Sequence, residues 1–242
     1  MKTLSFISVL IVFASILSSC TQTNSNSNST IDERVEDLMN QMTWEEKVTI
    51  LSRSDDLKVP GVERLGIPEI RFVNGPHGLH NDTATCFPAA VAMAASFDKQ
   101  LLKDVGRVIG EEALATKSHV LVAPTVNLHR IPIAGRNFES YSEDPYLSAR
   151  MGVNFIDGVQ SKKVGTSLKH YALNNQEWER YSVNVKIDER TMHEIYLPAF
   201  KAAVLESDPY TIMSSYNRIN DTYGSQHTYL LKEILREKWG YD

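Results

Sequence analysis

Three short segments that are predicted to form strands, each followed by a helical pattern, constrain the fold of this chain more than any other feature. They are HVLVAP (His119 to Pro124), VGTSL (Val164 to Leu168) and TIMSS (Thr211 to Ser215). HVLVAP is a continuous apolar run with flanking turn residues, as is typical of a strand buried on both faces, and VGTSL and TIMSS are predicted to be further strands. The alternation of such strands with helices predicts a parallel sheet with helices packed against it.

The helices are predicted from N-cap residues and from apolar side chains at helical spacing. The expected ranges are 97–116, 145–159, 189–206 with a bend at Pro198, and 230–238. Upstream, Thr30 with Glu33 and Thr43 with Glu46 have capping-box spacing, which predicts two further short helices.

A fourth strand is predicted at IRFV, which leads into the Gly/Pro-rich loop NGPHG. The long loops that follow the strands favour an α/β fold of the (β/α)8 TIM-like barrel type, in which such loops build the functional site. A Rossmann-type sheet is the alternative, but no G-x-G-x-x-G motif follows a strand.

Hydrogen-bonding side chains follow each of the four predicted strands. They are Asn74 and His77; Asn127, His129, Arg136, Asn137 and Glu139; Lys169, His170, Asn174, Asn175, Glu177 and Arg180; and Tyr216 and Asn217. The carboxyl ends of barrel strands meet at one rim, so we expect a polar pocket there. Sugars suit such a pocket, because Lys and Arg supply charge-assisted bonds to hydroxyls.

Two other ligands are less favoured at this rim. Lys and Arg also bind phosphate, but no Gly-rich phosphate loop precedes a helix. The histidines lack the close spacing of metal ligands, and two cysteines cannot form a cysteine-based metal site. The net charge of -5 over 242 residues gives no basic footprint for nucleic acid.

The first residues, MKTLSFISVLIVFASILSSC, predict a secretory signal peptide over residues 1–20, because the apolar run is too short for a comfortable bilayer span. The ending LSSC resembles a bacterial lipobox, so Cys20 is the expected lipidation site and the only membrane attachment. Plain secretion is the alternative. Residues 21–30 are expected to be a polar tether. The predicted location is exported: a periplasmic or cell-envelope lipoprotein of a bacterium.

Cys86 is the only other cysteine. If Cys20 carries lipid, Cys86 has no partner within the chain and is expected to be a small buried side chain.

From about Ile31 to Asp242 the chain resembles the N-terminal barrel of glycoside hydrolase family 3, whose members are chiefly β-glucosidases. The resemblance rests on the segments NGPHGLH, FPAAVAMAASFD, GRNFESYSEDPYLSARM, SLKHYALNNQEWER, DERTMHEIYLPAFKAAV and IMSSYNRIN. It implies that residues 31–242 form part of the barrel, truncated before its last strands.

The resemblance also implies a subsite for the non-reducing sugar. Its expected residues are Asn74, Arg136, Lys169, His170, Arg180, Met213 and Tyr216. The family usually has Asp where this chain has Asn74, and that Asp binds hydroxyls on the far edge of the sugar. No metal or organic cofactor is implied.

Catalysis in this family is retaining and uses two carboxylates. The resemblance places the nucleophile Asp just past Asp242 and the acid/base in a later domain, so the 242-residue chain alone is expected to be inactive. The expected activity of the whole protein is that of an exo-acting β-glucosidase. A β-xylosidase or other β-glycosidase is the first alternative, and a non-catalytic sugar-binding relative is an alternative of another class.

Overall fold

The computed structural model describes residues 30–52, 57–80 and 83–242. The chain divides into two compact units, residues 1–48 and 49–242, and each is described by itself. The predicted signal peptide and residues 21–29 of the predicted tether lie outside the described residues. Within the described part, no helix has the length and hydropathy that a membrane span requires.

Two capped helices form the first described segment. Helix α2 (Ile31–Gln41) begins after Thr30, whose side chain and that of Glu33 form the predicted capping box. Helix α3 (Trp44–Leu51) begins with the same reciprocal pair, Thr43 with Glu46, at 2.9 and 3.2 Å. Each box satisfies backbone N–H groups that have no partner within the helix, so both predicted helix starts are confirmed.

The second unit is built on a five-stranded sheet with the order β1-β2-β3-β4-β6. The strands are β1 (Lys58–Val59), β2 (Ile70–Asn74), β3 (Val120–Val122), β4 (Gly165–Tyr171) and β6 (Thr211–Ser214). Strands β2, β3, β4 and β6 pair in parallel, with Val73 opposite Leu121 and Leu168 opposite Ile212, whereas β1 pairs antiparallel with β2.

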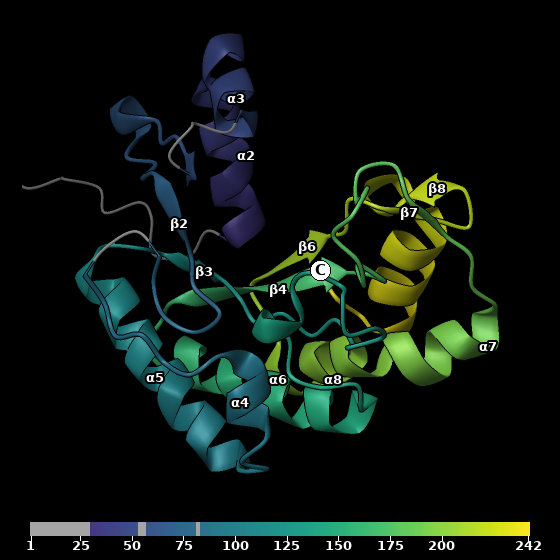
Figure 1. Cartoon of the computed structure of the whole chain (residues 1–242). Coiled ribbons are helices and arrows are strands. Elements are labelled where there is room, and N and C mark those ends of the chain that lie inside the picture. Colours follow the sequence, from purple (N-terminus) through teal and green to yellow (C-terminus); the bar gives the residue numbers. More distant parts are fainter. Residues whose placement is uncertain (1–29, 53–56, 81–82) are drawn as a thin grey trace, which may run out of the picture. The chain divides into compact units, whose positions relative to one another are not determined.

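The sheet adds its parallel strands in chain order, without the reversal that defines a doubly wound sheet. Helices α5 (Lys99–Ala115), α6 (Pro145–Gln160) and α8 (Pro198–Ser207) lie on one side of it (Figure 1). Successive strands with all covering helices on one face are the arrangement of a barrel. The chain is therefore an α/β protein with the first part of a (β/α)8-like barrel, as predicted, and the Rossmann alternative is wrong.

Several short elements were not predicted, because segments of two to five residues carry no readable periodicity. They are η1 (Glu63–Leu65), α4 (Ala90–Ala94), η2 (Asn137–Glu139), η4 (Gly224–Gln226), and the small sheet of β5 (Asn184–Val185), β7 (Arg218–Ile219) and β8 (Thr222–Tyr223).

Two helix predictions need refinement and one burial prediction is wrong. The segment predicted as a helix bent at Pro198 consists of α7 (Glu189–Thr191), the π-helical η3 (Met192–Tyr196) and α8, which begins at Pro198. The last predicted helix is the π-helical η5 (Tyr229–Lys238). Cys86 is exposed rather than buried, because it lies in the irregular segment before α4.

Helices α5 and α6 cross in close contact because each has a glycine at the crossing. A Cβ atom on Gly158 would lie 2.2 Å from the Lys103 carbonyl oxygen, and one on Gly106 would lie 2.4 Å from the Phe155 carbonyl oxygen. Phe155 is fully buried at this crossing. The backbones therefore approach too closely for any side chain, and this contact fixes α6, which precedes β4.

Gly158→Ala is therefore expected to reduce the free energy of unfolding by about 1 to 3 kcal/mol, the usual cost of overpacking. The methyl group would meet a backbone carbonyl, which cannot rotate away. Lys99→Ala, at an exposed position of α5, is the control. Denaturant unfolding of both variants measures the difference. A Gly158→Ala protein as stable as the control would show that the helices can separate at little cost.

Candidate active site

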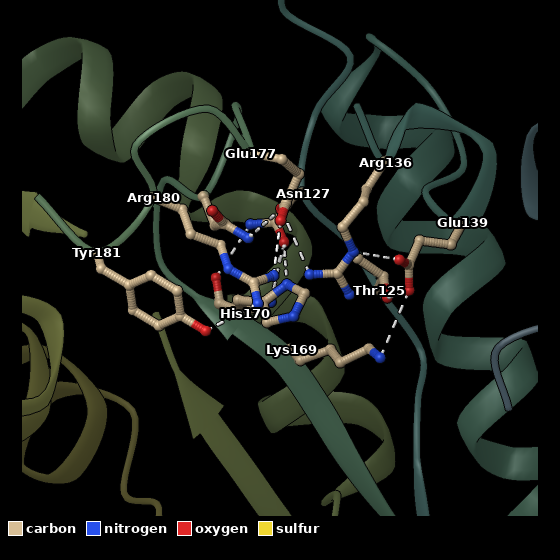
Figure 2. A network of polar contacts seen from close by, with 10 residues as sticks. Thr125, Asn127, Arg136, Glu139, Lys169, His170, Glu177, Arg180 and Tyr181 are labelled. Atoms are coloured by element: carbon tan, nitrogen blue, oxygen red, sulfur yellow. Dashed lines mark hydrogen bonds and ion pairs between the residues drawn. The ribbon is translucent and has the colours of Figure 1, made fainter. Parts of the chain in front are cut away.

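Lys169 and His170 lie within the last residues of β4, and not just after the strand as the sequence suggested. Both residues are 4% exposed. The pairing of β4 with β6 shifts register between Leu168 and Tyr171. Irregular pairing of this kind redirects side chains at the end of a strand. Both side chains reach the polar network at the carboxyl end of the sheet (Figure 2).

Glu139 is the central acceptor of this network. It lies in η2, within the long loop after β3, and is 6% exposed. Its Oε1 accepts a hydrogen bond from the Arg136 Nε, and its Oε2 accepts one from the Thr125 hydroxyl at 3.2 Å. The Lys169 ammonium lies 3.5 Å from Oε2. One buried carboxylate thus holds an arginine and a lysine from two different strand–loop units.

Burial and neighbouring charges shift the pKa values of both Glu139 and Lys169. Burial alone would raise the pKa of the Glu139 carboxyl, but the Arg136 hydrogen bond and the Lys169 charge outweigh burial and lower it to about 2. Burial lowers the pKa of the Lys169 ammonium, and the Glu139 charge opposes this effect. Glu139 is therefore ionised at neutral pH, which suits a fixed counter-ion and not a proton donor.

A second carboxylate, Glu177, extends the network across the loop after β4. Its Oε1 lies 3.4 Å from the Arg136 Nη1 and accepts a 3.2 Å hydrogen bond from the Asn174 amide. Its Oε2 accepts a 2.6 Å hydrogen bond from the Arg180 Nη1. Arg136 is consequently held between two carboxylates, as Figure 2 shows. Three cations and two carboxylates lie together, so the cluster has one excess positive charge.

Asn127 fixes the position and the tautomer of His170. Its amide nitrogen donates to the His170 carbonyl at 3.0 Å, and its Oδ1 accepts from the His170 backbone N–H at 3.0 Å. The same Oδ1 lies 2.9 Å from the His170 Nδ1, so Nδ1 carries the ring proton. Burial, followed by the charges of Arg136 and Lys169, lowers the pKa of His170 to about 3. The ring is therefore neutral, with Nε2 as a hydrogen-bond acceptor.

Arg180 connects the polar network with two tyrosines. Its guanidinium lies 5.0 Å from the ring centroid of Tyr181 and 5.1 Å from that of Tyr216. The two rings lie 4.8 Å apart at a tilt of 46°, and Tyr216 is 46% exposed. An aromatic surface therefore adjoins the charged cluster, and cation–π contacts hold Arg180 against it.

Asn74 is the last residue of β2, and not just after the strand as the sequence suggested, whereas Met213 lies near the carboxyl end of β6; both are half-buried. The Asn74 carbonyl accepts a 3.0 Å hydrogen bond from the His80 backbone N–H. Neither Asn74 nor Met213 is among the residues labelled in Figure 2. The structure thus joins Arg136, Lys169, His170 and Arg180 through hydrogen bonds and ion pairs, adds Tyr216 through a ring contact, and places these two residues on the same rim.

Sequence reasoning placed Glu139, Glu177 and Asn127 on the rim but gave them no role. Their role follows from the cations that they contact, which only the folded chain brings near. One feature of the sequence could have indicated the role of the two carboxylates. Several Lys and Arg residues follow buried strands, and they require carboxylates nearby because unpaired buried charge is costly.

The described residues contain no group of three or more metal-ligating side chains. The cavity among Arg136, His170 and Glu177 measures only about 10 Å³, so these side chains pack against one another. A larger cavity of about 820 Å³ shares the segment 174–176 and extends to β5 and Tyr196. The charged cluster contains Glu139 and His170, two buried groups with large pKa shifts, whereas the pKa of Asp188 in the larger cavity is lowered by its hydrogen bonds at the start of a helix.

A family model described as the glycosyl hydrolase family 3 N-terminal domain matches residues 12–242. A sugar-hydrolase barrel is thus the class of protein that the fold and this match define. The chain belongs to glycoside hydrolase family 3, as the sequence resemblance indicated.

Individual relatives agree with this assignment. The chain is 43% identical over 215 residues to a β-glucosidase of Rhizobium radiobacter, covering 86% of this chain and 26% of that protein. It is also 43% identical over 215 residues to an exo-α-(1→6)-L-arabinopyranosidase of Bifidobacterium longum, covering 83% of this chain and 28% of that protein.

Solved structures give the same result. A family 3 β-glucosidase of Bifidobacterium adolescentis matches with a TM-score of 0.81 and 46% identity, over 84% of this chain and 31% of that one. β-Glucosidase 3B of Thermotoga neapolitana in complex with α-D-glucose matches with a TM-score of 0.80 and 40% identity, over 86% of this chain and 33% of that one. This chain therefore spans about a quarter to a third of the length of these relatives.

The low pKa of His170 predicts a specific loss of stability in acid. The unfolded chain protonates this residue near its ordinary pKa of 6.5, whereas the folded chain resists protonation until about pH 3. Stability present above pH 6.5 is therefore lost as the pH falls. His170→Gln is expected to reduce the slope of unfolding free energy against pH, between pH 6 and 4.5, by up to about 1.4 kcal/mol per pH unit. Parallel curves for the two proteins would contradict a buried, neutral His170.

Proposed function

We propose that this chain forms the sugar-binding part of an exo-acting β-glucosidase, and that the Lys169–His170 cluster binds the non-reducing-end sugar of a β-glycoside. The observation that carries the proposal is that Lys169, His170, Arg136 and Arg180 are fixed side by side at the carboxyl end of a family 3 barrel sheet. Functional sites of such barrels are built at this end.

The chemistry of the cluster suits hydroxyl groups. The Lys169 ammonium donates hydrogen bonds, whereas the neutral His170 ring offers an acceptor at Nε2. Adjacent donor and acceptor groups match two neighbouring sugar hydroxyls, each of which can both donate and accept. Arg136 adds a second fixed donor, since its orientation is set by Glu139 and Glu177. Tyr216 offers a partly exposed ring beside Arg180, on which a sugar or its leaving group can stack.

The catalytic carboxylates are proposed to come from other parts of the protein. Glu139 suits neither catalytic role, because its low pKa prevents proton donation at neutral pH and its two oxygens are engaged by Arg136, Thr125 and Lys169. A retaining mechanism with a nucleophile Asp beyond Asp242 and an acid/base from a later domain remains our proposal. The 242-residue chain then binds sugar without hydrolysing it.

The identity of the sugar is a separate question. Relatives at the same 43% identity are named as a β-glucosidase and as an L-arabinopyranosidase, so overall similarity does not choose between them. β-Xyloside hydrolysis and non-catalytic sugar binding are the other candidates. We further propose export to the bacterial cell envelope through lipidated Cys20, from the sequence MKTLSFISVLIVFASILSSC.

The test is to express the protein encoded by the complete reading frame and to assay it on nitrophenyl β-glucoside, β-xyloside and α-L-arabinopyranoside. We expect turnover of the β-glucoside with retention of anomeric configuration, which NMR of the first-formed product reports. The 242-residue chain, assayed alongside, is expected to show no turnover, since loss of a nucleophile costs many orders of magnitude. A full-length protein that binds glucose but hydrolyses none of the three substrates would favour the non-catalytic alternative.

Asn74→Asp tests whether this position contacts a gluco-configured sugar. A carboxylate accepts hydrogen bonds from two hydroxyls, whereas an amide offers one acceptor and directs a donor at the other hydroxyl. We expect kcat/KM of the full-length protein for the β-glucoside to rise about tenfold, equivalent to roughly 1.4 kcal/mol. The β-xyloside provides the comparison substrate. A fall in activity on the glucoside would mean that the site is shaped for another sugar, in which the new charge finds no donors.

A further inference from the structure

We infer that Glu139 is a positioning residue, which holds Lys169 in its charged form and directs its ammonium to the sugar site. Glu139 acts through Lys169 and Arg136 and does not itself contact the sugar. The expected effect of Glu139 on activity rests on the proposed function. The effect of Glu139 on the charge state of Lys169 does not, because it involves only these two residues of the chain. It assigns a role to a residue that the sequence had only placed on the rim.

The geometry separates Glu139 from an ordinary surface ion pair. The Lys169 side chain is 5% exposed and the Glu139 side chain 7% exposed, so water screens neither charge. The carboxylate cannot swing away, because Arg136 and the Thr125 hydroxyl hold its two oxygens (Figure 2). The 3.5 Å separation from Lys169 is long for a hydrogen bond. The ammonium is thus attracted by Glu139 but keeps its N–H groups for a ligand.

Other groups around Lys169 do not replace this attraction. The ionisable side chains whose charges affect Lys169, or are affected by it, are Glu139, Arg136, Glu177, His170 and His80. Arg136 repels the ammonium, and His170 is neutral at physiological pH. Burial lowers the pKa of the imidazole of His80, so this residue adds no favourable charge. Glu177 attracts Lys169 more weakly than Glu139 and forms its hydrogen bonds with Arg136 and Arg180.

Glu177 therefore provides the matched control. It is a partly buried carboxylate on the same arginine, but the Lys169 ammonium has its ion pair with Glu139. Glu139→Gln and Glu177→Gln each remove one negative charge and keep the side-chain size. A general loss of packing or of Arg136 orientation would affect both variants, whereas a specific effect on Lys169 would appear chiefly with Glu139→Gln.

The first experiment measures Lys169 directly in the 242-residue chain and needs no enzymatic activity. Acetic anhydride reacts only with the neutral amine, so acylation of Lys169 is followed by peptide mass spectrometry as a function of pH, with exposed Lys99 as internal reference. With Glu139→Gln, we expect the midpoint of Lys169 reactivity to move to lower pH by about one unit or more. With Glu177→Gln, the shift is expected to be less than half as large. An unchanged midpoint in a Glu139→Gln protein that melts normally would overturn the inference.

Glu139→Gln can also fail to fold, because it leaves the buried Lys169 ammonium and the partly buried Arg136 guanidinium with less counter-charge. In that case the double variant Glu139→Gln/Lys169→Met tests whether Glu139 is paired with Lys169, because it also removes the Lys169 charge. Recovery of a cooperative melting transition in the double variant supports the pairing of Glu139 with Lys169. A double variant that melts no better than Glu139→Gln would contradict it.

The second experiment tests the functional consequence in the full-length protein. Glu139→Gln is expected to reduce kcat/KM on the β-glucoside, and this loss is expected to be at least about fivefold smaller in a Lys169→Met background. Equal losses in both backgrounds would show that Glu139 does not act through Lys169. If the full-length protein hydrolyses no glycoside, the proposed function fails while the labelling experiment still decides the role of Glu139.

Discussion

The interaction on which the site depends is the contact of the buried Glu139 carboxylate with Arg136 and Lys169. Burial disfavours the ammonium of a lysine at 4% exposure and lowers its pKa, and the charge of the nearby Glu139 opposes this effect. Glu139 comes from the loop after β3, whereas Lys169 comes from β4. The charged site therefore exists only when two neighbouring strand–loop units of the barrel are correctly packed.

The packing that brings these units together is apolar and lies on the helix-covered side of the sheet. The backbones of helices α5 and α6 approach closely at Gly106 and Gly158. This contact fixes the position of α6, which leads into β4. Strand β4 is buried along its whole length and delivers Lys169 and His170 at its carboxyl end. The irregular pairing with β6 occurs at these two residues. The core thus determines where the chain emerges, and the loops determine which polar groups meet there.

The network combines rigidity with unused hydrogen-bonding capacity. Asn127 forms three contacts with His170, and Glu177 holds Arg136, Asn174 and Arg180 together. Lys169 and the His170 Nε2 nevertheless keep groups that can bind a ligand. Preorganised donors and acceptors of this kind lower the ordering cost of binding a polar ligand. This arrangement explains why so many charged and amide side chains follow a single buried strand.

The sequence by itself determined the strand–helix alternation, the capping boxes of α2 and α3, the parallel sheet and the family, since all of these depend on local pattern or on long matching segments. It also placed Lys169, His170, Arg136 and Arg180 at one rim. It could not assign Glu139, Glu177 or Asn127 their partners, because Glu139 and Lys169 are 30 residues apart and meet only across the β3–β4 pairing. The two-residue strands of the small sheet and the exposure of Cys86 were also decided by tertiary structure. Local pattern determines which segments form strands and helices, whereas the charge state and orientation of a buried side chain depend on groups that only the folded barrel brings within reach.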